Sequence, residues 1–214
     1  MTGAIIILLV FCGLAFYFIK KKKGAEKEDA GFKQRIPRSP TYAKDDLRIE
    51  NVEAGGVIHL SGIGPDLEEF DVRILAKHLY RQGGSSWWEL EGESPKGKVW
   101  IDLEEDDELE LSISLKKLKL RDIALSKDDL DRIDDEEEGE LAYRGEKYFY
   151  EDSDEATFYK YGNEANGERF YYWDFENDAG DKFIGVEKWS DGSFEAAYSE
   201  PIQSHQVTVY SLKK

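Results

Sequence analysis

Short runs of alternating polar and apolar residues, separated by turn residues, recur from residue 48 to the end of the sequence, except in the connecting segment 116–140. The run Leu109–Leu115 (LELSISL) keeps a period of two throughout. The runs Trp87–Glu91 and Lys98–Leu103 are joined by Pro and Gly residues, as in a hairpin. Because side chains of a strand point alternately to its two faces, such runs favour strands with one covered face. The pattern predicts a mainly β domain over residues 47–214.

Eight further segments have the composition of strands. They are Val57–Leu60, Phe70–Tyr80, Leu141–Tyr150, Thr157–Tyr161, Glu168–Glu176, Lys182–Trp189, Ser193–Ser199 and Gln206–Leu212. A short helix is the alternative for Phe70–Tyr80. Asp191-Gly192 predicts a two-residue hairpin turn between two of them. Ser126, followed three residues later by Asp129, is typical of a helix N-terminus and predicts a short helix. The acidic cluster Asp134–Glu138 is expected to be a solvated loop.

An internal similarity appears when the sequence is shifted by 85 positions. Residues 88–91 (WELE) then align with residues 173–176 (WDFE), and Val99 and Ile101 align with Ile184 and Val186. We therefore expect two similar antiparallel β-meander halves, about 48–115 and 141–212, that form a sandwich or a pseudo-symmetric barrel. Segments 85–112 and 170–197 should match at equal register.

Strand periodicity also assigns the two faces of these motifs. Trp88 and Leu90 point one way, and Glu89 and Glu91 point the other. We expect the aromatic and apolar side chains to form the core. The carboxylates should then lie on a solvated outer face.

The first residues predict a membrane anchor. Ala4–Ile19 is an unbroken apolar run, and Lys20–Lys23 follow it at once. A cleaved signal peptide would have a basic segment before the run and a small-residue cleavage site after it, and neither is present. Residues 1–23 are therefore expected to form one transmembrane helix. Residues 24–46, with Pro37 and Pro40, are expected to form a flexible tether.

Lysine residues beside a span favour the cytoplasmic side. We expect the N-terminus outside and the domain on the cytoplasmic face of the inner membrane. The single cysteine, Cys12, falls within the predicted span, so no disulfide is expected. Residues 1–40 carry a net charge of +5, and the whole chain carries −17, so residues 41–214 carry the difference, −22. Such a domain repels nucleic acid, and a charged partner should be cationic.

The common catalytic motifs are absent from the sequence. It contains no GxxxxGK[ST], GxGxxG, HExxH, CxxC or GxSxG pattern. The histidines, His59, His78 and His205, are far apart, and the acidic clusters do not match a calcium-binding loop. We predict no catalytic residue, no metal site and no cofactor.

Carboxylates near aromatic faces suit ammonium groups, which are attracted by charge and by cation–π interaction. Tyr80, Trp87, Tyr171 and Tyr172 could supply such faces. The candidate ligand-binding residues are His78, Glu89, Glu91, Asp174 and Glu176.

Four stretches resemble an uncharacterised bacterial family, domain of unknown function 4178. They are IENVEAGGVIHLSGIGPDLEEFDV (49–72), HLYRQGGSSWWELEGE (78–93), KVWIDLEEDDELELS (98–112) and YYWDFENDAGDKFIGVEKWSDGSFE (171–195). The resemblance covers about residues 48–212. It implies a module often joined to a membrane segment, with genes that tend to lie beside polyamine-synthesis and membrane-stress genes. It implies no established reaction and no catalytic residues.

Two functions remain open from the sequence. The first is a non-catalytic, membrane-anchored interaction or sensing module that holds another protein or a cationic ligand at the cytoplasmic face. The alternative is an enzyme of unfamiliar reaction with a site near His78 and the two tryptophan motifs. Convergence of His78, Glu89 and Asp174 in one pocket would favour the enzyme, and scattered exposed positions would favour the binding module.

Overall fold

The computed structural model describes residues 47–105 and 108–212. The predicted anchor (1–23), which includes Cys12, and the predicted tether (24–46) lie outside these residues. Within the described ranges, no helix is long and apolar enough to cross a membrane.

The domain is mainly β, as predicted, and its strands form one antiparallel sheet of eleven strands. The first half holds β1 (Val57–Ile63), β2 (Glu68–Gln82), β3 (Ser85–Ser94), β4 (Gly97–Glu105) and β5 (Leu109–Leu118). The second half holds β6 (Glu140–Tyr143), β7 (Glu146–Tyr159), β8 (Gly167–Asn177), β9 (Phe183–Trp189), β10 (Phe194–Ile202) and β11 (Val207–Ser211). The helical elements are η2 (Ile49–Asn51), η3 (Leu120–Ile123), α2 (Lys127–Glu136), η4 (Lys160–Gly162) and η5 (Ser204–Gln206).

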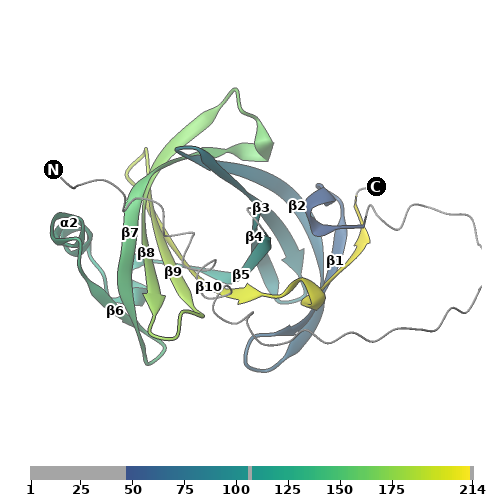
Figure 1. Ribbon diagram of the computed structural model, residues 1–214, viewed down its shortest axis with the longest axis horizontal. Helices are drawn as coiled ribbons and strands as arrows, with labels where there is room; N and C mark the ends of the chain where they lie inside the picture. The colour runs from purple at the N-terminus through teal and green to yellow at the C-terminus, as the bar shows by residue number, and fades with distance from the viewer. Residues whose placement is uncertain (1–46, 106–107, 213–214) are drawn as a thin grey trace, which may run out of the picture.

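The sheet closes on itself to form a ring. Its strand order is β11-β1-β2-β3-β4-β5-β10-β9-β8-β7-β6, and β2 also pairs with β7. Eight strands, β2 to β5 and β7 to β10, therefore surround a common interior, and β1, β11 and β6 extend the sheet beyond the ring. Figure 1 shows the two sets of ring strands facing one another, with α2 outside β7 and with β1 and β11 at the opposite side.

Two apolar clusters cover ring strands on the face away from the interior. The first packs Leu90, Ile101 and Leu111 of β3, β4 and β5 against residues of β1 and η2. The second packs Trp173 and Phe175 of β8 and Ile184 of β9 against Leu130 and Ile133 of α2. The helix begins after Ser126, whose side chain caps the backbone N–H of Asp129, as the sequence predicted.

Bulges in β2 and β7 decide which side chains reach the ring interior. In β2, Ile74 pairs with Gly92 but Ala76 pairs with Glu91, so one extra residue interrupts the alternation. In β7, Tyr150 pairs with Phe175 but Asp152 pairs with Asp174. An extra residue moves every following side chain to the opposite face. Each of these two long strands therefore contributes side chains to an apolar cluster at one end and to the ring interior at the other.

Four local predictions need correction. The predicted strand Thr157–Tyr161 is not a separate strand, because β7 runs from Glu146 to Tyr159 and Tyr161 lies in η4. The predicted strand Leu141–Tyr150 is a hairpin, β6–β7, that turns at Arg144 and Gly145, both of positive φ. The acidic cluster is not entirely a loop, because α2 extends to Glu136. The turn at Asp191-Gly192 is a hairpin turn, but its loop has three residues, since the N–H of Trp189 bonds to the carbonyl of Ser193.

The prediction of equal register between segments 85–112 and 170–197 is wrong. Glu89 pairs with Asp102, whereas Asp174, 85 positions after Glu89, pairs with Gly185 rather than with Glu187. The β8–β9 hairpin is thus shifted by two residues relative to β3–β4, which contradicts an ungapped duplication. Because the shift is even, the residues at the shifted positions stay on the same face of the sheet.

Candidate ligand-binding cavity

The ring encloses a cavity of about 130 Å³. A single water needs roughly 10–15 Å³ by the same measure, so the space admits a small molecule. The polar and aromatic side chains that line it include Tyr80, Trp87, Glu89, Trp100, Asp102, Ser112, Ser114, Lys117, Glu151, Tyr172, Asp174, Glu176 and Glu187. Glu151 is also exposed on the protein surface, so the cavity reaches solvent at that residue.

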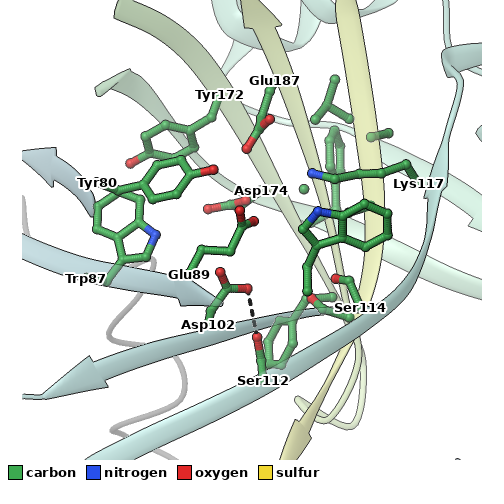
Figure 2. A pocket seen from close by; sticks show the side chains of 18 of the residues that line it. Tyr80, Trp87, Glu89, Asp102, Ser112, Ser114, Lys117, Tyr172, Asp174 and Glu187 are labelled. Atoms are coloured by element: carbon green, nitrogen blue, oxygen red, sulfur yellow. Dashed lines mark hydrogen bonds between the residues drawn. The ribbon is translucent and has the colours of Figure 1, made fainter. Parts of the chain in front are cut away.

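Four carboxylates from four strands point into this cavity (Figure 2): Glu89, Asp102, Asp174 and Glu187. Asp102 accepts a hydrogen bond from the Ser112 hydroxyl at 3.2 Å. Glu89 is only 8% exposed, yet its carboxylate accepts no hydrogen bond from any described residue. One oxygen of Glu187, Oε2, is likewise buried without a hydrogen-bond partner among the described residues. Buried carboxylates without partners are costly, so this arrangement calls for a bound cation or proton.

Burial raises the pKa of all four carboxyl groups. The pKa of Glu89 rises to about 8, first through burial and then through the charge of Asp102. Burial raises the pKa of Asp102 to about 6, although Lys117 and Ser112 oppose the shift. Burial also raises the pKa of Asp174 strongly, with Asp152 adding to it, and raises that of Glu187. Below neutral pH, protons therefore share this cavity with any cation.

Lys117 is the one cationic side chain among the described residues that line the cavity. Its Nζ lies 5.4 Å from the Trp100 ring centroid and 3.7 Å from Glu195 Oε2. Burial lowers its pKa, but the nearby carboxylates, led by Glu187, more than offset this and raise the pKa above its usual value. Lys117 is therefore a charged ammonium group held against an aromatic face.

A bulge turns Lys117 inward. Ser112 and Ser114 of β5 line the cavity, so simple alternation would bring Lys116 next. However, Ser114 pairs with Ser199 and Lys117 pairs with Ala197, so two residues of β5 oppose the single residue Tyr198. This bulge makes Lys117 the next inward residue.

Small residues between Asp174 and Lys117 leave the space open. Asp174 pairs with Gly185, Gly185 pairs with Ala197, and Ala197 pairs with Lys117, which sets the four residues in one row across the sheet. A Cβ atom at Gly185 would lie 3.3 Å from Asp174 Oδ1, closer than an ordinary contact. The row thus combines a carboxylate at one end, an ammonium group at the other, and little side-chain volume between them.

Aromatic side chains form the wall opposite Lys117 (Figure 2). The rings of Tyr80 and Trp87 stack with centroids 5.2 Å apart, and Phe170 meets Tyr80 edge-on at 5.8 Å. The Tyr172 hydroxyl donates to Asp152 at 3.4 Å. This wall supplies π faces beside the carboxylates of Glu89 and Asp174.

The structure brings together three of the five predicted ligand-binding residues. Glu89, Asp174 and Glu176 line the cavity, whereas His78 and Glu91 do not. Glu91 instead pairs with Lys98, whose hydrogen bond is the main cause of the lowered pKa of Glu91.

His78 is buried beside the cavity wall with both ring nitrogens engaged. Its Nδ1 accepts the N–H of Tyr161 at 3.1 Å, and its Nε2 lies 3.6 Å from Glu91 Oε2. Burial lowers its pKa. His78 pairs with Glu89 in the β2–β3 ladder and shares its face of the sheet, but it does not line the cavity. The convergence of His78, Glu89 and Asp174 that would favour an enzyme is therefore only partial.

The face assignment of the two motifs needs correction. Glu89 and Asp174 do lie opposite Leu90 and Trp173, but they face the enclosed interior of the ring and not solvent. Trp88, expected in the core, is 38% exposed. Asp102, Glu187 and Lys117 also line the cavity but were not predicted from the sequence. The alternation of β4 and β9 places Asp102 and Glu187 on the inner face, but only once the closure of the ring is known.

In residues 47–105 and 108–212, no three His, Cys, Asp or Glu side chains form a group that could hold a metal ion. A family model described as "Domain of unknown function (DUF4178)" matches residues 66–204. No curated protein and no solved structure matches the chain.

Proposed function

This chain belongs to the DUF4178 domain family, and we propose that its domain is a non-catalytic binding module that takes a small organic ammonium ion inside the ring. One observation carries the proposal. Four inward carboxylates face a single lysine in a cavity lined by aromatic rings, and Oε2 of one of them, Glu187, is buried without a hydrogen-bond partner among the described residues.

The chemistry of the lining supports an organic cation. Carboxylates attract any cation, but the stacked Tyr80 and Trp87 rings add cation–π attraction and cover the alkyl part of a ligand. Desolvated cation–π contacts are worth about 2 kcal/mol. An ammonium group can also donate hydrogen bonds to Glu89 and Asp174, which have no other donors among the described residues.

A cationic small molecule is preferred to a protein as the partner for these carboxylates. They line the interior of a closed ring, where the surface of another folded protein has no access. The sequence-based expectation of a protein partner therefore has to rest on other parts of the surface.

We also propose that residues 1–23 anchor the domain at the cytoplasmic face of the inner membrane. The support is the apolar run Ala4–Ile19 followed by Lys20–Lys23. Protease added outside intact spheroplasts should spare the domain, and its digestion there would reverse the proposed orientation.

Calorimetric titration of the full-length protein with n-butylammonium at pH 8 tests the binding function. We expect binding that weakens as NaCl is added, because a cation-binding site loses attraction and meets competition from Na⁺. Asp174→Asn should lower the affinity by about tenfold, since it removes a charge from the cavity.

The matched control is Glu93→Gln, which removes one carboxylate from the exposed end of β3. It should leave the affinity within about twofold of the wild-type value. Absence of binding at millimolar ligand, or equal losses in the two variants, would contradict the proposed site.

A further inference from the structure

We propose that Lys117 is a built-in ammonium group that permanently occupies one end of the cavity, so that the external ligand is a monoamine with a single positive charge. This inference rests on the proposed function and specifies the ligand class of the same site.

The surroundings of Lys117 are those expected for a bound amine. Its Nζ is 5.4 Å from the centre of the Trp100 ring. Glu187, Glu89, Glu195 and Asp102 act on it electrostatically, with Glu187 the strongest of them. An aromatic face with several carboxylates is the combination that recognises ammonium ligands in general. Here the cation is covalently tethered to β5.

The other end of the cavity has similar chemistry but no cation among the described residues. Figure 2 shows Tyr80, Trp87 and Tyr172 on one side, Lys117 on the other, and Glu89 and Asp174 between them. Glu89 is 92% buried, from its 8% exposure, and accepts no hydrogen bond from a described residue. At this end the Glu89 carboxylate is therefore a hydrogen-bond acceptor that points into the cavity and has no donor among the described residues.

The position of Lys117 has a consequence for specificity. A diamine could place one ammonium at Glu89 and Asp174, but its second ammonium would approach Lys117 at the Trp100 end. Like charges brought together in a desolvated space repel strongly. Lys117 therefore selects against a second positive charge on the ligand.

The test compares n-butylamine with 1,4-diaminobutane on the full-length protein by calorimetry at pH 8. The two ligands share their carbon chain and differ in the second ammonium group. The wild-type protein should bind the diamine no more than about threefold tighter, a margin that includes its twofold statistical advantage. Lys117→Met keeps most of the side-chain length and removes the charge, so it should favour the diamine by about tenfold or more.

Lys116→Met is the matched control, because it removes the same charge from the exposed neighbouring residue of β5. It should keep the wild-type ratio of the two affinities. Lys117→Gln serves as a second variant if Lys117→Met fails to fold. A wild-type preference of tenfold or more for the diamine would overturn the inference without any variant.

The two proposals fail in different ways. If the wild-type protein binds neither amine, the proposed function is wrong. If it binds butylamine but Lys117→Met or Lys117→Gln gains no preference for the diamine, the binding function stands and the role of Lys117 is refuted.

Discussion

Adjacent residues of β3 are buried in two regions with opposite chemistry. Leu90 is fully buried in the apolar cluster shared with β1, β2, β4 and β5. Glu89, one position earlier, is 8% exposed and points into the ring. Burial stabilises the first side chain, because apolar surface leaves water, and destabilises the charged form of the second. Apolar clusters on the outer faces thus hold together a ring whose interior opposes folding when it is ionised.

The comparison separates residues that stabilise the fold from residues that shape the site. Removing an apolar side chain from the outer face should destabilise the fold and leave binding unchanged, whereas neutralising a carboxylate on the inner face should relieve the cost of its burial and change the charge of the cavity.

The largest expected effect is on the apolar side. Leu90→Ala should lower the free energy of unfolding by about 2–5 kcal/mol, the usual range for a fully buried leucine. Urea denaturation at fixed pH measures this change. Butylammonium affinity of the folded protein should remain within about twofold of wild type, and a large loss would show that the two faces are not separable.

The next-largest expected effect is a stabilisation, and its size depends on pH. The pKa of Glu89 rises from 4.5 to about 8 on folding, so the folded state holds its proton more tightly. The protonated group therefore favours folding below about pH 4.5, and this contribution is lost as pH rises towards 8. Glu89→Gln mimics the protonated group and should stabilise the protein by roughly 2–4 kcal/mol at pH 8, since each pKa unit corresponds to about 1.4 kcal/mol.

At pH 4.5 the same variant should have nearly wild-type stability. Urea denaturation of both proteins between pH 4.5 and pH 8.5 gives the difference directly. If the difference in stability between the variant and the wild type is the same at both ends of this range, Glu89 ionises in the folded protein much as it does in the unfolded chain.

The smallest effect on stability and binding is expected at Glu91, two residues after Glu89. Glu91 lies on the same face of β3 as Glu89 but pairs with Lys98, whose side chain is 59% exposed, and with His78. Glu91→Gln should change stability by no more than about 1 kcal/mol. Butylammonium affinity should change by less than twofold, because Glu91 does not line the cavity. A loss as large as that of Asp174→Asn would extend the site to His78.

Most strands could be predicted from the sequence because alternation is local. The opposition of Glu89 and Leu90 followed from the same period. The hairpin at Arg144 and Gly145 was missed, since the aromatic residues on both sides of it continue a strand-like composition. Which face of β3 is enclosed could not be predicted, because closure depends on β2 pairing with β7, as at Tyr80 and Phe158. No local pattern specifies a contact between segments so far apart in the sequence.

Lys117 shows a second limit of periodicity. Alternation from Ser112 and Ser114 indicates Lys116 as the inward residue, and the bulge opposite Tyr198 makes it Lys117. The cation of the cavity thus depends on a backbone irregularity that leaves no clear composition signal. The same holds for Tyr80, which reaches the interior only after the bulge in β2.

The row that joins Asp174 to Lys117 through Gly185 and Ala197 also limits the length of the open space between the two charged side chains. No side chain along it extends past a single methyl group until the ammonium of Lys117 is reached. On the proposed function, the side chain of residue 197 would set the length of ligand that fits. This side chain can be made longer one carbon at a time while the charges at both ends of the row stay in place. A substitution at residue 197 alone could therefore change the length of the amine that the proposed site accepts.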